Sequence, residues 1–327
     1  MYKQFFGLTE YPFSLTPDPR FLVATPRYNE LLASLYYGIE MAKGLIVLTG
    51  EVGTGKTTAL RWIIRRLDSS VLAAYIYNPH LSIEEFYHNI AESFDVKEWS
   101  NKSSLLKQLG KLCEDRHRRG LWTILIVDEA HELSDEVLEE IRLLMNLESD
   151  NAKHLQIILT GQPELLEKLR QRNLRQLKQR VALNCKMPSL STVGEVGQYI
   201  TERLKIAGST NPNIFSVAAI DFIFQCSEGI PRQINNLCDN AMIAAYASNV
   251  NVIGRAILEE TARELDLLPN SEKLLASDKA LEVIGSARVL TPLGREELLS
   301  EHKPHVPHSK VKNIRGNPPE PNGKEKT

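Results

Sequence analysis

A glycine-rich loop at residues 50–58 constrains the fold more than any other stretch of the sequence. Its residues read GEVGTGKTT, which fits the P-loop pattern G-x-x-x-x-G-K-[ST]. The apolar run 45–48 before the loop is typical of a buried strand, and apolar residues recur at helical spacing over 60–67 behind it. A strand, a glycine loop and a helix in this order predict a phosphate-binding site rather than a glycine turn that carries a lysine by chance.

The loop offers three kinds of phosphate-binding group. Glycine reaches backbone conformations that other residues avoid, so successive N–H groups can turn inward around phosphate oxygens. The N-terminus of the following helix adds the positive end of its dipole. We expect the Lys56 ammonium to reach the β- and γ-phosphates of ATP, and the Thr57 hydroxyl to bind Mg²⁺.

A second apolar run, residues 123–127, ends in the acids Asp128 and Glu129. A strand followed by two acids is the form of a Walker B motif. In that motif the first carboxylate holds Mg²⁺ through its hydration shell, and the second polarises the attacking water as general base. The alternative is a plain turn at a strand end. Residues 128–131 also spell the DEAH box of certain helicases, but companion helicase motifs are not apparent, and we expect His131 to be an ordinary surface side chain.

These two motifs define the expected ATP site. The predicted nucleotide-binding residues are Gly50, Glu51, Val52, Gly53, Thr54, Gly55, Lys56, Thr57, Thr58 and Asp128. The predicted magnesium ligands are Thr57 and Asp128.

Two polar side chains outside these motifs are candidates for sensing the γ-phosphate. Thr160 follows the strand pattern 155–159, where a polar group can lie between the Walker acids and the phosphate, although a threonine can also simply end a strand. Arg232 follows Pro231 at the start of a helix pattern, in a region that reads as four short helices. We expect these helices to form a lid that brings Arg232 to the γ-phosphate of its own subunit, the alternative being an ordinary surface arginine.

The segment 165–180 is rich in lysine and arginine. Three interpretations compete, namely a solvated helix face, a phosphate-binding patch for DNA, and a subunit edge that carries an arginine finger. The segment lies between the sensor strand and a short strand at 181–183, which favours the finger. An arginine inserted into a neighbouring site stabilises the charge on the transferred phosphoryl group. We favour Arg180 for this role, with Arg175 second.

Composition and charge limit the classes of protein to which this chain can belong. The chain has 327 residues, 43% apolar and 24% charged, which are ordinary values for a soluble globular protein. Its formal net charge of −2 indicates no global basic field for nucleic acid, although a local patch is compatible with it. The four cysteines form no C-x-x-C pair and are expected to be reduced and buried. Because neither a signal-peptide pattern nor an apolar run of membrane-spanning length is found, we expect a cytoplasmic protein.

The two ends of the chain differ in character. Residues 1–30 are aromatic and proline-rich, so we expect an irregular arm that packs on the core of the protein. Within this entry segment Phe21, Leu22 and Leu31 are candidates for holding adenine, with plain core packing as the alternative. From residue 269 onward the apolar pattern decays, and a linker and disordered tail are expected over 269–327.

In this order the motifs resemble those of an AAA+ ATPase, and the chain is similar to the bacterial ExeA/GspA type, the general secretion pathway protein A family. The similarity covers roughly residues 1–268. It is carried by YKQFFGL at 2–8, PF at 12–13, TPDP at 16–19, LTGQPEL at 159–165, residues 175–181 and GIPRQIN at 229–235. The resemblance implies an α/β fold, in which a parallel five-stranded sheet of order 5-1-4-3-2 lies between helices and a small all-helical lid follows. The implied domains are the arm and ATPase core at 1–190, the lid at 191–268, and the linker and tail at 269–327.

The resemblance also implies a function. It implies Mg²⁺-dependent ATP binding and hydrolysis by a homo-oligomer that drives or switches a macromolecular assembly of the secretion or cell-envelope type. It further implies a protein partner that would hold the ATPase at the inner membrane. Members of this family usually continue into a membrane span and a peptidoglycan-binding domain, and neither pattern is found here, which makes a stand-alone relative or a cytosolic subunit the expectation.

Two other functions compete with this one. The same core resembles TniB-like transposition ATPases, so a DNA-associated ATPase that regulates transposition or replication is the main alternative. A nucleotide-dependent scaffold with little turnover is another, but a protein that only binds nucleotide does not need the general base that Glu129 supplies.

Overall fold

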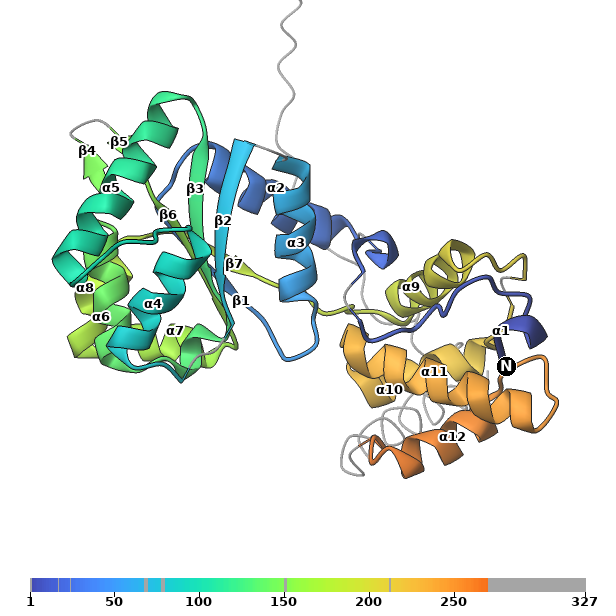
Figure 1. The fold of residues 1–327 in the computed structure, drawn as a ribbon. Helices are drawn as coiled ribbons and strands as arrows, with labels where there is room; N and C mark the ends of the chain where they lie inside the picture. Colours follow the sequence, from blue (N-terminus) through green and yellow to red (C-terminus); the bar gives the residue numbers. More distant parts are fainter. Residues whose placement is uncertain are drawn as a thin grey trace, which may run out of the picture. The chain divides into compact units, whose positions relative to one another are not determined.

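The computed structural model describes residues 2–269, except 17, 24, 68–69, 78–79, 150–151 and 212 (Figure 1). The linker and tail predicted for 269–327 lie, from residue 270 onward, outside the described residues. Residues 1–269 cluster as one unit, so the boundary placed near residue 190 stays a prediction.

Five parallel strands form the central sheet. They are β1 (Leu45–Thr49), β2 (Val71–Ile76), β3 (Trp122–Val127), β6 (Gln156–Gly161) and β7 (Val181–Lys186). Their order is β2-β3-β6-β1-β7, which confirms the predicted order 5-1-4-3-2 when the five strands are numbered along the chain. The short strands β4 (Glu148–Ser149) and β5 (Ala152–Lys153) form a separate antiparallel pair. Because the large sheet is parallel, the carboxyl ends of β1, β3 and β6 lie at the same edge.

Helices cover both faces of this sheet, and alternate strand residues point to opposite faces. Ile46, Ile126 and Ile158 join one hydrophobic cluster with the helices α2 (Pro26–Glu40) and α3 (Lys56–Leu67). Val47 and Val127 join another cluster on the opposite face. The helices of that second cluster are α4 (Ile83–Ser93), α5 (Lys102–Arg118), α6 (Asp135–Leu144), α7 (Glu164–Leu169) and α8 (Arg175–Gln179).

The second half of the chain forms the four helices that the sequence predicts. They are α9 (Val193–Ile206), α10 (Val217–Ser227), α11 (Pro231–Ala247) and α12 (Arg255–Glu264). The side chains of Thr192 and Ser216 cap the first two by accepting a backbone N–H, and Pro231 occupies the first turn of α11. We call these four helices the lid.

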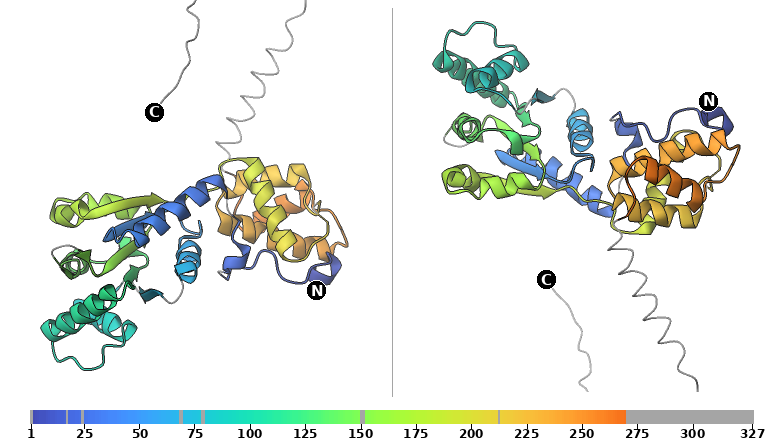
Figure 2. Two further views of the ribbon diagram at one scale, coloured as in Figure 1. Left: turned by 90° about the horizontal axis from the view of Figure 1, so that it is seen from above. Right: turned by 90° about the horizontal axis from the view of Figure 1, so that it is seen from below.

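The N-terminal arm packs mainly on the lid, and its last residues also contact helix α3. It contains α1 (Tyr2–Phe5) and a 3-10 turn, Pro19–Phe21. Figure 2 shows this dark blue segment beside the yellow and orange lid helices. The arm residues in the hydrophobic cluster of the lid are Tyr2, Phe6, Leu8, Phe13 and Phe21. The aromatic rings of the arm pack against the apolar stripes of the lid helices, whereas Leu22 packs against the cluster of α2 and α3. The grouping of the arm with the ATPase core stays a prediction.

Two further features of the described residues bear on the predictions. All four cysteines are free thiols with buried side chains, and burial raises the pKa of Cys113 to about 12 and that of Cys185 to about 11. Among residues 2–269 with the gaps given above, no helix is both long enough and apolar enough to cross a bilayer.

Candidate nucleotide-binding site

The P-loop joins the end of β1 to the start of α3, as the sequence predicts. Gly53 and Gly55 have φ angles of 82° and 96°, a region that side chains with a Cβ rarely enter. A Cβ at Gly53 would lie 2.4 Å from the Cβ of Arg232, whereas one at Gly55 would meet nothing within 4 Å. Within the described part of the chain, the N–H groups of Gly53, Gly55 and Lys56 donate to no protein acceptor. These free donors at a helix N-terminus fit a phosphate group.

The Lys56 ammonium is buried beneath this loop. Its Nζ donates to the carbonyl oxygens of Gly50, at 2.7 Å, and Glu51, at 3.2 Å. Burial lowers the pKa of Lys56, and the negative charges of Glu129 and Asp128 oppose that shift. Among the described residues, the hydrogen bonds of this desolvated cation go to neutral carbonyls, so a phosphate oxygen would add a negatively charged acceptor.

Asp128 accepts hydrogen bonds from two hydroxyl groups, one on helix α3 and one on strand β6. The Thr57 hydroxyl, in the first turn of α3, donates to Asp128 Oδ2 at 3.0 Å. The Thr160 hydroxyl, near the end of β6, donates to Asp128 Oδ1. β6 lies between β1 and β3, so the topology itself brings these three side chains to one edge. Carboxylate and hydroxyl oxygens are ligands that suit Mg²⁺, so this set fits the predicted metal.

Glu129 is held in an unusual backbone conformation beside Asp128. Its φ of 49° is left-handed, and it begins the 3-10 helix Ala130–Glu132. Its side chain is 43% exposed, yet Oε2 is buried and has no hydrogen-bond partner among the described residues. Because Oε2 is buried, Oε1 is the oxygen through which this partly exposed carboxylate, next to the proposed metal ligand, can accept a proton from water.

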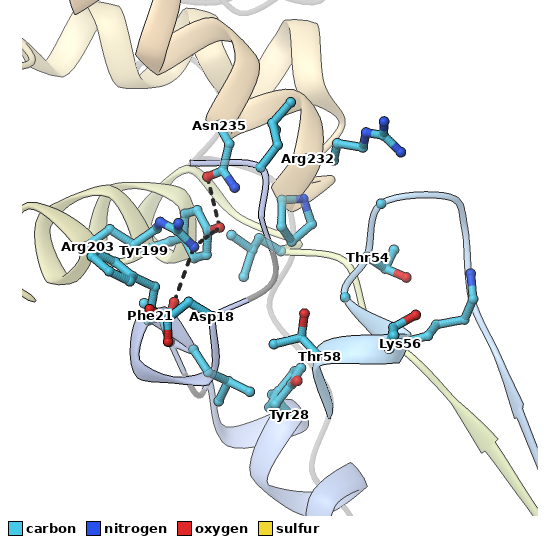
Figure 3. Close-up of a pocket in the computed structure, with 18 of the residues that line it drawn as sticks. Asp18, Phe21, Tyr28, Thr54, Lys56, Thr58, Tyr199, Arg203, Arg232 and Asn235 are labelled. Atoms are coloured by element: carbon cyan, nitrogen blue, oxygen red, sulfur yellow. Dashed lines mark hydrogen bonds between the residues drawn. The ribbon is translucent and has the colours of Figure 1, made fainter. Parts of the chain in front are cut away.

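A cavity of about 350 Å³ connects the P-loop to the arm and the lid (Figure 3). Its volume falls within the range of small-molecule sites. Among its lining residues are Asp18, Phe21, Leu22, Tyr28, Thr58, Glu129, Tyr199, Arg203, Arg232 and Asn235. Of the three adenine candidates, Phe21 and Leu22 line the cavity, whereas Leu31 is buried against the sheet.

Arg232 lies directly against the P-loop. Its backbone N–H donates to the carbonyl oxygen of Gly53 at 3.1 Å, and its side-chain carbons leave no room for a Cβ at that glycine. The residue is exposed, and its guanidinium has no hydrogen bond or ion pair within the residues that the structure describes. The lid arginine is therefore available to a ligand bound in the loop.

The arm and the lid are joined by a buried arginine that sequence reasoning missed. Arg203 of α9 donates to the carbonyl oxygens of Pro12, at 2.6 Å, and Phe21, at 3.2 Å. It also donates to the Tyr199 hydroxyl, which in turn donates to Asn235 of α11 (Figure 3). In the sequence Arg203 looks like any charged residue of an amphipathic helix, because the carbonyls that hold it lie about 190 positions away.

The two finger candidates lie away from the site of their own chain. Arg180 immediately precedes β7, whose first residue pairs with Leu45 at the amino end of β1. The P-loop follows the opposite end of β1, a strand of five residues, or about 16 Å. Arg175 begins α8 and is exposed. The structure thus brings together the P-loop residues, Asp128, Glu129, Thr160 and Arg232, but not these two arginines.

Comparisons with known proteins agree with this geometry. Residues 39–169 match the family described as AAA domain. The chain is 42% identical over 269 residues to general secretion pathway protein A of Aeromonas hydrophila, covering 81% of this chain and 48% of that protein. It is 28% identical over 128 residues to the ATP-dependent target DNA activator B of Escherichia phage Mu, covering 39% of each chain. The chain therefore spans half or less of the length of these relatives.

Solved structures confirm the fold. Cdc6p from Pyrobaculum aerophilum matches with a TM-score of 0.60 and 18% identity, covering 81% of this chain and 73% of that one. The Aeropyrum pernix ORC2 protein matches with a TM-score of 0.59 and 16% identity, covering 78% and 71%. The comparisons also agree with the predicted class of enzyme, a P-loop ATPase. The chain thus contains an AAA domain at residues 39–169 and, as its motifs predict, resembles the AAA+ ATPases of the general secretion pathway protein A type.

Proposed function

We propose that the protein binds ATP with Mg²⁺ and hydrolyses it as a homo-oligomeric AAA+ ATPase, and that this cycle drives or switches a macromolecular assembly. The observation that carries the proposal is the hydroxyl–carboxylate–hydroxyl chain Thr57–Asp128–Thr160 beside the P-loop. It joins three segments distant in sequence at the carboxyl edge of a parallel sheet, where ligands of such folds bind.

Each residue has a defined role in this proposal. Lys56 and the free N–H groups of the loop bind the phosphates, and oxygens of Thr57 and Asp128 hold Mg²⁺. The metal, when bound, neutralises charge on the phosphate oxygens. Glu129 accepts the proton of the attacking water, Thr160 positions Asp128, and Arg232 contacts the γ-phosphate from the lid.

Replacing Lys56 with alanine is expected to weaken ATP binding about 10–150-fold. A hydrogen bond to a charged group contributes about 1.5–3 kcal/mol, and its loss changes the dissociation constant by that factor. Titration with a fluorescent ATP analogue measures the change, and circular dichroism checks that the variant is folded. Lys43→Ala, which removes an exposed lysine before β1, is the matched control and should bind as the parent does. Equal affinity of the two variants would contradict the assignment of Lys56.

The assembly that we propose is of the secretion or cell-envelope type. Its support is the 42% identity to general secretion pathway protein A over most of this chain. In this proposal the protein acts in the cytoplasm and reaches the inner membrane through a protein partner. Neighbouring subunits complete each site with Arg180, or with Arg175 as the second candidate.

A DNA-associated ATPase that regulates transposition or replication is the second candidate function. It is supported by the similarity to a target DNA activator and by four exposed basic side chains on and beside α7 and α8, namely Arg170, Arg172, Arg175 and Lys178. For the secretion-type function we expect ATP turnover that double-stranded DNA leaves unchanged. The rate is measured with and without DNA at two salt concentrations. Stimulation that falls steeply with salt indicates phosphate contacts and would favour the second function.

A further inference from the structure

The side-chain amide of Asn235 is a buried polar group with an unused donor. Asn235 lies in the second turn of α11, and only 7% of the residue is exposed. Its Oδ1 accepts a hydrogen bond from the Tyr199 hydroxyl at 3.0 Å, whereas its Nδ2 has no partner among the described residues. The residue lines the cavity beside the P-loop (Figure 3). Because buried donors in folded proteins are nearly always paired, this unused N–H group points to a ligand.

The orientation of this amide follows from the groups behind it. The Arg203 guanidinium can only donate, and its Nη1 lies 3.1 Å from the oxygen of the Tyr199 hydroxyl. The hydroxyl therefore accepts from Arg203 and sends its own proton to Asn235, which must present its oxygen to Tyr199. The amide nitrogen is left on the cavity side. The arginine thus fixes Asn235 as a hydrogen-bond donor toward the cavity.

Asn235 lies in the part of the cavity that suits a base. Phosphate groups would bind at the P-loop, whereas Phe21, Tyr28 and Tyr199 line the part between the arm and the lid. Figure 3 shows Asn235 beside Tyr199 and away from Lys56. A nucleotide whose phosphates lie on the loop would place its base among these aromatic side chains, which can pack against a flat ring. The donor of Asn235 therefore faces the base rather than the phosphates.

We propose that Asn235 recognises the purine base of the bound nucleotide, and that its Nδ2–H group donates to an acceptor nitrogen of the ring. Adenine carries acceptor nitrogens at N1, N3 and N7. Tyr199 and Arg203 are positioning residues, because they hold the amide with its donor toward the cavity. The inference rests on the proposed function, which places ATP in this cavity, and it adds the side chain that reads the base.

Deaza analogues of ATP test the contact without any change to the protein. In 1-deaza-, 3-deaza- and 7-deaza-ATP, one ring nitrogen is replaced by a C–H group, which cannot accept a hydrogen bond. We expect one of these analogues to bind the parent protein about 3–10-fold more weakly than ATP, the effect of one neutral hydrogen bond. Competition against a fluorescent ATP analogue measures each affinity.

Asn235→Leu keeps the approximate size of the side chain and removes the donor. The variant should bind ATP about 3–10-fold more weakly and should no longer distinguish ATP from that analogue. It should bind tripolyphosphate as the parent does, because tripolyphosphate has no base. Tyr199→Phe releases the amide and should lose part of the same discrimination. Asn240→Leu, which changes an exposed asparagine of α11, is the matched control.

The outcomes separate this inference from the proposed function. A parent protein that binds all the deaza analogues as tightly as ATP would overturn the base contact. So would an Asn235→Leu protein that still distinguishes the analogue, or one that loses affinity for ATP and tripolyphosphate equally. Weaker binding of 2′-deoxy-ATP in place of a deaza analogue would assign the amide to the ribose instead. A protein with the expected affinities but no ATP hydrolysis would overturn the proposed function and leave the role of Asn235 intact.

Discussion

Arg180→Ala is expected to lower ATP turnover about 10³–10⁵-fold while ATP affinity stays close to that of the parent. Arginine fingers contribute rate factors of this size, equivalent to about 4–7 kcal/mol of transition-state stabilisation. The location of Arg180 supports a role in a neighbouring subunit, because it lies at the amino end of β7 and the P-loop follows the opposite end of β1. Phosphate release measures turnover, and titration with a nucleotide analogue measures affinity.

Mixing two inactive variants tests whether the arginine acts between subunits. The Arg180→Ala protein keeps its own P-loop, and the Lys56→Ala protein keeps its own Arg180. In a mixed oligomer some sites therefore combine an intact loop with an intact arginine, and part of the activity should return. Arg172→Ala, an exposed arginine of the same segment, is the control and should leave turnover unchanged. Mixtures that remain inactive would remove the main support for a finger supplied by a neighbour.

Glu129→Gln is expected to lower turnover about 10²–10⁴-fold, the usual contribution of a general base. The amide keeps the size of the side chain but cannot take a proton from water, so ATP should bind and remain uncleaved. Single-turnover hydrolysis and equilibrium binding, measured on the same protein, separate the two effects. Glu167→Gln is the control, because it also removes one negative charge but from an exposed carboxylate of α7, and it should behave as the parent does. Unchanged turnover in Glu129→Gln would withdraw the base assignment.

The order of the sheet could be predicted because each strand is a short apolar run beside a recognisable motif. The three inner strands β1, β3 and β6 are buried, the edge strands β2 and β7 are only partly buried, and the resemblance supplies the strand order. The packing of the arm could not be predicted in the same way. Its aromatic residues are compatible with any apolar surface, and only the fold shows that both faces of the sheet are already covered.

In the site, too, some residues could be predicted from the local sequence and others could not. Lys56 and Thr57 belong to one contiguous motif, and Asp128 and Glu129 end one apolar strand, so their positions follow from local structure. His131 stands in a motif that suggests an exposed turn. Its burial depends on Gly161 and Gln162, about 30 positions further along the chain. No periodicity or spacing in the sequence carries information about such a contact.

By itself, the sequence determined that this protein has a P-loop, a pair of acids at a strand end and a helical segment behind them, because these features are encoded by neighbouring residues. The tertiary structure alone decided three other points: that Glu129 faces His131, that Arg203 joins the arm to the lid, and that Arg180 lies at the far end of β1 from the loop. The physical reason is that a polar side chain is placed by the partners that satisfy it, and here those partners come from other strands and helices.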